Sequence, residues 1–427
     1  MANEEHLDIL KHGIDVWNRW REEHPGVVPD LTGADLEEES LVRVVFREAD
    51  LSGADLSGTF LVQADLAEAC LWGADLRRAD LRRADLTQAN LQETDLRAAN
   101  LSRANLEGAD LAEANLEGAY LSGANFRATD FSRANLEGTY LFGANFQGAD
   151  LSGANLRAAN PERADLRGAD LQEAYLQSAS LKAAFLQNTN LQQAILVDAT
   201  LQVALLIKTQ LQDADLRGAD LQGANLREAN LQGANLQEAQ LQEANLQGAS
   251  LLAADLRHAD LHRTNLTGVD FRETTLADSD GSAANLSEAI LTGAKLTGRG
   301  EGGVDSGFLE LANAVGLETA DFDKEAFLSR YLAEAFKYAH EPDLKEAEAY
   351  PTFVEKTIEN IKLLRSLIQT HAEAPPPALV KVVQTITAEL IKYLKAYPKE
   401  LYQLRPRQFE ELIAEILAAY GLSLIHI

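Results

Sequence analysis

The chain has 427 residues, a formal net charge of −28 at pH 7 and a single cysteine, Cys70. An acidic surplus of this size argues against bulk binding to nucleic acid or membranes, and one cysteine excludes an internal disulfide and a cysteine-ligated metal cluster. No apolar run predicts a membrane span or a signal peptide, so we expect a cytoplasmic protein.

Residues 1–30 predict one amphipathic helix over 4–23, with Asn3 as its N-cap. Four apolar side chains fall on one stripe of this helix: Leu7, Leu10, Ile14 and Trp17. We expect the stripe to cover the first turn of the repeat that follows, as an N-terminal capping helix. A partner-binding helix would bury the same stripe, and it stays an alternative.

From residue 31 to residue 300 the chain repeats a unit of five residues. Leu or Phe occupies every fifth position from Leu31 to Leu296, and only Pro161 and Gly281 depart from that rule. A step of five residues overshoots one helical turn by about 140°, so a helix would scatter these leucines. A straight strand would point successive leucines to opposite faces. The spacing therefore predicts a chain that turns a corner in every unit, with each leucine directed to one axis.

Each unit places Ala and Leu inside and an Asp or Asn between them outside, as in Ala54-Asp55-Leu56. This pattern resembles the pentapeptide-repeat family. The resemblance implies a mainly β fold, a right-handed quadrilateral β-helix with four units per coil. About 13 coils would then form a rod about 60 Å long, at roughly 4.8 Å per coil. Pro161 and Gly281 would share one side of the rod, and we expect a local bend or a widened corner at each.

The outward positions become apolar between residues 175 and 207. The predicted interaction patch consists of Tyr175, Phe185, Ile195, Val197, Val203, Leu205 and Ile207. With 20 residues per coil, positions 175 and 195 stack on one side of the rod, and 185 and 205 stack on the opposite side. Contiguous exposed apolar patches commonly mark contacts, so we predict a docking or dimer surface that uses one strip or both. Outward residues chosen only for high β-propensity are the alternative.

Elsewhere the repeats contain no catalytic arrangement, cofactor motif or small-molecule site, and we predict that they are non-catalytic. Tyr120 and Tyr140 are expected to stack one coil apart as a stabilising ladder. The repeats carry a net charge of −17 over 31–300. Some pentapeptide-repeat proteins resemble acidic DNA mimics that occupy the DNA site of gyrase, which is an alternative function. A basic cluster argues against it, made of Arg77, Arg78, Arg82 and Arg83.

After residue 300 the five-residue pattern stops and helical spacing begins. Residues 301–400 predict an all-α adaptor domain, which is entered through a glycine-rich hinge at 298–307.

Residues 401–421 contain a short polar lead, the run Phe409-Glu410-Glu411-Leu412 and a terminal Tyr-Gly. This segment resembles the first helix of an Mrr-like type IV restriction endonuclease domain. The resemblance implies that acidic metal ligands and a lysine follow beyond 421, with a divalent metal such as Mg²⁺ as cofactor. Glu410 matches a glutamate that approaches the metal in that family, and an ordinary surface glutamate is the alternative. Residues 422–427 are typical of an in-frame sequencing adapter, so we expect the catalytic core to be missing; a natural C-terminal strand is the alternative.

Together these patterns predict a non-catalytic scaffold that binds a protein partner or forms a homodimer through its solenoid. The full-length protein would be fused to a DNA endonuclease for restriction or defence, and it would contact DNA only through that domain. The alternative is a stand-alone interaction protein, or an acidic DNA mimic that acts on a DNA-binding enzyme. No membrane or small-molecule partner is expected.

Overall fold

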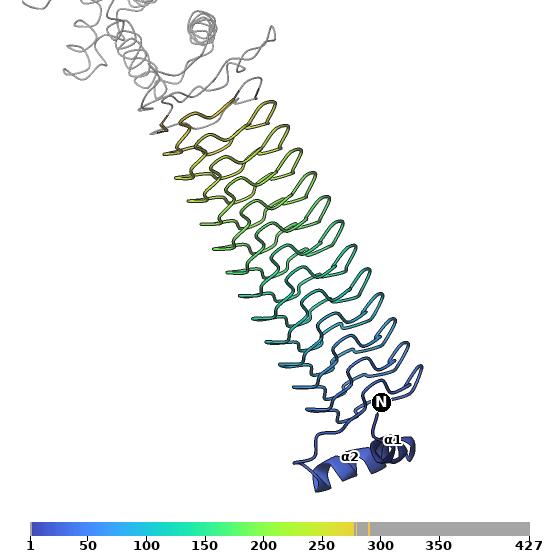
Figure 1. Cartoon of the computed structure of the whole chain (residues 1–427). Coiled ribbons are helices and arrows are strands. Elements are labelled where there is room, and N and C mark those ends of the chain that lie inside the picture. Colours follow the sequence, from blue (N-terminus) through green and yellow to red (C-terminus); the bar gives the residue numbers. More distant parts are fainter. Residues whose placement is uncertain (1, 277–278, 280–288, 291–427) are drawn as a thin grey trace, which may run out of the picture.

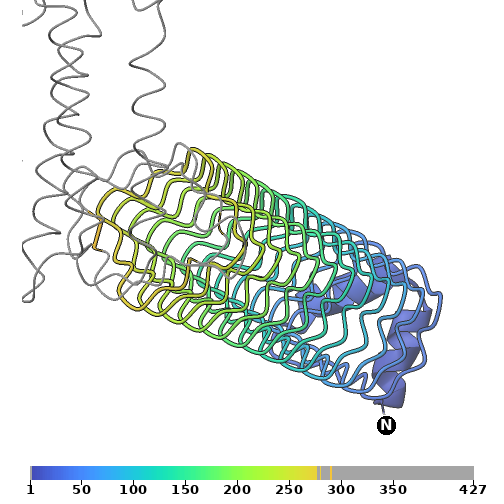
Figure 2. The same cartoon turned by 90° about the horizontal axis from the view of Figure 1, so that it is seen from above.

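Two short helices and a four-sided solenoid make up the part of the chain that the computed structural model describes, which is residues 2–276, 279 and 289–290 (Figure 1). The helices lie at one end of the rod, and the coils stack away from them (Figure 2). The predicted adaptor at 301–400, the nuclease-like helix at 401–421 with Glu410, and the segment 422–427 lie outside the described residues.

Every unit of five residues contains one tight turn that forms a corner of the solenoid. The carbonyl of the unit's Leu accepts a hydrogen bond from the amide three residues later, as Leu31 does from Ala34 at 3.0 Å. The third residue of the turn has a positive φ at every unit from Gly33 (64°) to Glu273 (59°). This conformation is typical of a type II turn. The predicted corner in each unit is therefore confirmed.

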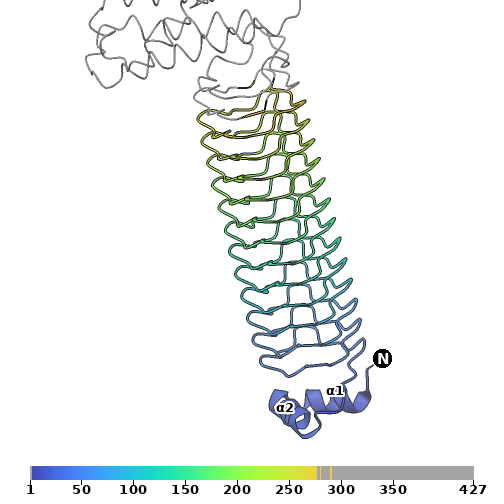
Figure 3. The same cartoon turned by 90° about the vertical axis from the view of Figure 1, so that its left-hand side faces the viewer.

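Parallel β-bridges join outward residues to those 20 positions later, beginning with Asp30 and Asp50, with one exception at Asn160. The bridges are isolated, so no strand longer than a single bridge occurs among the described residues. The Leu31 amide donates to the Asp50 carbonyl at 2.7 Å, and the Asp50 amide donates to the Pro29 carbonyl at 2.8 Å. A repeat of 20 residues confirms four units per coil. The coils stack one on another along the rod (Figure 3).

The interior of the rod is a continuous column of the repeated Leu and Ala side chains. Each of these leucines and alanines is 0–5% exposed in the described coils. Phe126, Phe131 and Phe146 replace three of the leucines and pack together, with ring centroids 4.8–5.7 Å apart. Burial of each large side chain contributes roughly 1.5–3 kcal/mol, so the column supplies the main favourable term.

Pro161 does not widen its corner, and that expectation is wrong. Its carbonyl still accepts from the Ala164 amide at 3.0 Å, which is the ordinary turn geometry. What changes is the ladder between coils, because proline has no amide hydrogen to donate. The bridge between Asn160 and Ser180 is the single one missing from the series between Asp30 and Thr275. Gly281 lies outside the described residues.

The N-terminal cap consists of two helices, α1 (Glu4–Lys11) and α2 (Ile14–Glu23), so the prediction of one helix over 4–23 is wrong. Gly13 separates them with a φ of 108°, a conformation that glycine adopts at little cost. The predicted N-cap is confirmed, because the Asn3 side chain accepts a hydrogen bond from the Glu5 amide at 2.9 Å.

The cap covers the first coil and also satisfies its unpaired backbone groups. Trp17 is fully buried, and its indole nitrogen donates to the Val45 carbonyl at 2.8 Å. The Asn18 side-chain oxygen accepts from the Val45 amide at 2.9 Å. The Arg21 guanidinium donates to the Arg47 carbonyl at 2.8 Å. An open edge of this kind would otherwise pair with another chain, so the predicted capping role is supported by direct contacts.

Candidate functional site

The outward residues of two opposite sides of the rod form ladders of asparagine. We call side A the outward positions that recur every 20 residues from 85 to 265, and side B those from 115 to 235. On side A the Asn125 side chain donates to Asn105 at 2.8 Å, and Asn145 donates to Asn125 at 3.1 Å. On side B the Asn155 side chain donates to Asn135 at 2.9 Å. These amides satisfy one another along the axis of the rod.

The side A ladder stops at Asn145, and Asp165 and then two apolar side chains occupy the next positions. Phe185 and Leu205 occupy consecutive positions and are joined by a bridge, after which Asn265 and Asn245 resume the ladder at 3.1 Å. Two further apolar residues lie at the corners that flank Leu205. The four residues that we call patch A are Phe185, Val203, Leu205 and Ile207. Phe185 is 40% exposed and Val203 is 53% exposed, so patch A offers apolar surface to solvent.

The ladder on side B is interrupted at the same level of the rod. Tyr175 and Ile195 are joined by a bridge, and Val197 lies at the next corner. We call these three residues patch B. The guanidinium of Arg157 lies 4.5 Å from the centroid of the Tyr175 ring and covers part of it. The predicted stacking of 175 with 195 and of 185 with 205 is confirmed, and the predicted residues form two separate patches.

Val203 occupies a strained backbone position within patch A. Of the turn positions with positive φ in the repeats, 17 hold Gly and 32 hold other residues, and Val203 is the only β-branched residue among them. Its φ of 51° is a genuine outlier for a β-branched side chain. Strain of this kind costs about 1–3 kcal/mol and clusters at functional sites. Val203 is therefore both strained and exposed within patch A.

The charges around patch A have a positive sum on a rod that is otherwise acidic. The surrounding corners and outward positions are 162–168, 182–188, 202–208 and 222–228, and they contain five cations and three carboxylates. Lys182 makes no ion pair with any residue that the structure describes.

The charges around patch B have the opposite sum. The corresponding positions are 152–158, 172–178, 192–198 and 212–218, and they contain two arginines and four carboxylates. The two patches therefore differ in the sign of their surroundings, by +2 against −2 in formal charge.

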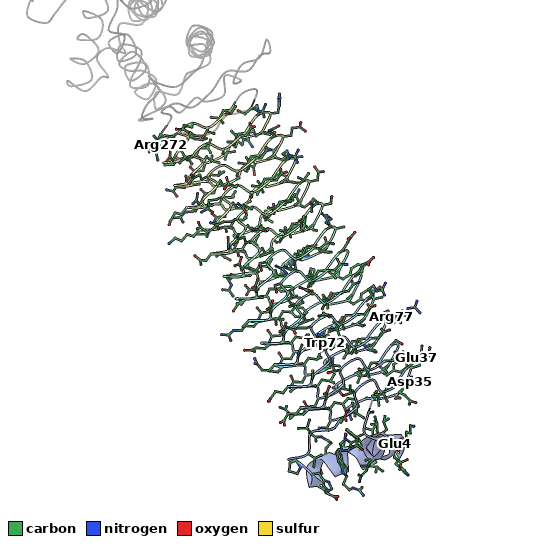
Figure 4. The ribbon with its side chains drawn as sticks, viewed as in Figure 1. Glu4, Asp35, Glu37, Trp72, Arg77 and Arg272 are labelled. Atoms are coloured by element: carbon green, nitrogen blue, oxygen red, sulfur yellow. The ribbon has the colours of Figure 1, made fainter. Side chains whose placement is uncertain are left out.

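The sequence-based prediction missed an exposed aromatic residue on a third part of the surface. Tyr120 and Tyr140 stack as predicted, with parallel rings 4.9 Å apart. Phe142, at the adjoining corner, is 46% exposed, and Arg163 lies 5.7 Å from its ring centroid. The sequence does contain a sign of this exposed residue, because Phe142 occupies a turn position that usually holds a small or polar residue. Trp72 is likewise exposed at a corner (Figure 4).

Two members of the predicted basic cluster are paired within the rod. Arg77 binds Asp75, and Arg82 binds Asp80 at 2.5 Å. These side-chain hydrogen bonds lower the pKa of both carboxyl groups below the ordinary value. The same pairing of an Asp with the Arg two residues later recurs as far as Arg272, near the other end of the described coils (Figure 4).

The sequence predicts no metal site in the repeats. Over the described ranges, no group of three or more His, Cys, Asp and Glu side chains is arranged to hold a metal ion. In the same part of the chain no helix is both long and apolar enough to span a membrane.

A family model for pentapeptide repeats (8 copies) matches the chain in overlapping segments from residue 30 to residue 298. The chain is similar to HetL, a pentapeptide repeat protein involved in heterocyst differentiation regulation from the cyanobacterium Nostoc sp. strain PCC 7120. The two are 32% identical over 66% of this chain and 97% of HetL, with a TM-score of 0.23.

Two further solved structures are similar over shorter stretches. Rfr23, a pentapeptide repeat protein from the cyanobacterium Cyanothece 51142, is 39% identical over 25% of this chain and 58% of its own, with a TM-score of 0.14. QnrB1, a plasmid-mediated fluoroquinolone resistance protein, is 17% identical over 43% of this chain and 90% of its own, with a TM-score of 0.25. No curated protein sequence matches.

Proposed function

This chain belongs to the pentapeptide-repeat family, and we propose that it is a non-catalytic scaffold that binds protein through patch A and patch B of its solenoid. The observation that carries the proposal is the interruption of both asparagine ladders by apolar residues at one level of the rod. We place the scaffold in the cytoplasm, because its one cysteine, Cys70, is free and suits a reducing compartment.

The two patches have the features that concentrate binding energy in protein interfaces. Each contains an aromatic residue, Phe185 or Tyr175, that is exposed next to aliphatic neighbours and a rim of charge. Aromatic residues near the centre of a contact carry most of the energy, and the charged rim fixes the choice of partner. The backbone beneath the patches is held by the ladder of hydrogen bonds, so little ordering cost accompanies binding.

A matched pair of variants tests the proposal. Phe185→Asp with Leu205→Asp places charge in patch A, whereas Asn245→Asp with Asn265→Asp adds the same charge to side A outside the patch and its surroundings. Each protein serves as bait in quantitative affinity capture, and the captured partner is then purified and titrated by calorimetry. We expect the wild type and the control to bind it equally and the patch variant to lose at least tenfold in affinity. Equal affinities for all three proteins would remove patch A from the proposal.

The family match ends at residue 298, and no similar protein supports the predicted fusion to an endonuclease. We retain it as a proposal about the full-length protein, with DNA contact confined to that domain. Resequencing the source locus through the codon for Gly421 tests it. Codons for the acidic and lysine positions of a metal-dependent nuclease would support the fusion, and a stop codon after Ile427 would end it.

A further inference from the structure

We infer that the partner of the solenoid is a second copy of this chain, with patch A of one rod packed against patch B of the next. The inference rests on the proposed scaffold function and names the partner. Its basis is that the two patches lie on opposite sides of the rod, at one level, with surroundings of opposite charge.

The two patches meet without any shift along the axis. Ten residues, which is half a coil, separate Tyr175 from Phe185 and Ile195 from Leu205. At roughly 4.8 Å per coil, the difference in level is about 2.4 Å. A second rod that is moved sideways, without rotation, therefore presents Tyr175 and Ile195 to Phe185 and Leu205.

The corners that border the patches are also complementary in that arrangement. The corner that follows side A on one rod faces the corner that precedes side B on the next rod. Lys208 of the first rod then lies opposite Asp213 of the second. Their levels along the axis differ by about a quarter of a coil, roughly 1.2 Å. Lys208 pairs with Glu228 of its own chain at 3.4 Å and retains further donors for a second carboxylate. At the other corner, Val203 of patch A faces Val197 of patch B. The strained valine thus has an apolar counterpart.

One feature of the contact opposes association. Arg157 and Arg163 face each other at the corner that holds the two valines, and like charges repel. Each guanidinium lies over an aromatic ring of its own chain, Tyr175 for Arg157 and Phe142 for Arg163, which reduces its projection toward a neighbour. The remaining rod surface is acidic, so we expect an association that is weak and depends on concentration.

The symmetry of the contact has a structural consequence. A contact between two different surfaces is heterologous, and here the surfaces lie on opposite sides of a straight rod. Such a contact cannot close on itself, so each added copy leaves one patch A and one patch B free. We expect open rows of parallel rods rather than a closed dimer.

Complementation between two variants of the full chain tests the inference by sedimentation velocity at 0.15 M salt. Leu205→Asp removes patch A, and Ile195→Asp removes patch B. We expect the wild type to form dimers and larger species as its concentration rises to about 1 mM. Each variant alone should remain a monomer, because one of the two required surfaces is lost. An equimolar mixture should form dimers and nothing larger, since one intact patch A then meets one intact patch B.

The controls Asn245→Asp and Asn235→Asp add the same charge to sides A and B outside the patches, and both should associate like the wild type. Circular dichroism melting must show that all four variants are folded. A monomeric wild type at about 1 mM would overturn the inference. So would self-association of Ile195→Asp alone, which indicates contact of patch A with itself, or a mixture that stays monomeric.

The proposed scaffold function has a separate outcome. If the wild type is monomeric but a different protein is captured in a way that depends on Leu205, the scaffold proposal stands and the second copy is excluded. If neither self-association nor capture responds to changes in the patches, both fail.

Discussion

Side A of the rod contains two stretches with the same backbone and opposite surfaces. At positions 105, 125 and 145 the outward asparagines donate to one another. At positions 185 and 205 the same slots hold Phe and Leu, which are joined by an equivalent bridge. The backbone therefore accepts either type of residue at an outward slot. Because the fold does not require the apolar pair, its presence points to contact with another molecule.

The interior differs from both stretches, because buried apolar side chains fill it in every described coil. Phe131→Ala removes a fully buried ring from the aromatic cluster and should lower the free energy of unfolding by about 3–5 kcal/mol. Asn125→Ala, on the outward ladder, should cost about 1 kcal/mol. Urea denaturation followed by circular dichroism measures both. Equal losses would contradict the assignment of stability to the interior column.

In the first coil, side chains of the N-terminal cap bond the backbone groups that a preceding coil would bond elsewhere in the rod. Asn18→Ala leaves the Val45 amide without its acceptor and should cost about 1–3 kcal/mol. Amide hydrogen exchange should accelerate at Val45 and remain unchanged at Asn145. Asn18→Asp keeps the acceptor for Val45 and loses only the hydrogen bond that Asn18 donates to the Arg43 carbonyl at 3.0 Å, so exchange at Val45 should stay slow in this control. Unaltered exchange at Val45 in Asn18→Ala would show that the cap does not satisfy this edge.

The strain at Val203 separates stability from binding. Val203→Gly relieves a left-handed turn and should raise the free energy of unfolding by about 0.5–1 kcal/mol, because the gain in backbone conformation exceeds the entropy lost by glycine. The same change should weaken self-association. Gly223→Val reverses it one coil later and should destabilise, since its Cβ would lie 3.3 Å from the Val203 side chain. If Val203→Gly lowered the free energy of unfolding, the claim that the backbone of Val203 is strained would be wrong.

The Asp–Arg pairs should have the smallest effect. The Arg82 hydrogen bond lowers the pKa of Asp80, so the folded state binds fewer protons there than the unfolded state. Its contribution is complete above the ordinary Asp value of about 3.9 and is lost as the pH falls through the lower folded pKa. Arg82→Gln should lower the free energy of unfolding slightly at pH 7, and the loss should shrink as the pH falls below the ordinary Asp value. Thermal melts of both proteins at several pH values check this, and a cost that grows in acid would contradict it.

The sequence predicted those features that a strict period determines. The spacing of leucines required a corner in each unit, and bridges at intervals of 20 residues agree with four units per coil. The break at Gly13 was missed because the apolar stripe continues across it in register. The left-handed turns at residues such as Glu38 and Arg43 could not be predicted from residue type. The hydrogen bonds of the coil impose this conformation on residues that rarely adopt it.

The candidate site could be predicted only in part, for a related reason. Periodicity assigned Tyr175, Phe185, Ile195 and Leu205 to their sides, since register alone decides this. The contact of Arg157 with Tyr175 depends on side-chain conformation, which register does not specify.

The most direct test converts the apolar stretch of side A into the asparagine ladder. A protein with Phe185→Asn and Leu205→Asn keeps the interior and the charge unchanged and places asparagine at every side A position from 185 to 265. Sedimentation velocity compares its association with that of the wild type, while denaturation checks that the free energy of unfolding changes by less than about 1 kcal/mol. We predict an equally stable protein that is monomeric at concentrations where the wild type associates. Undiminished association of the variant would show that the apolar stretch is not the contact surface.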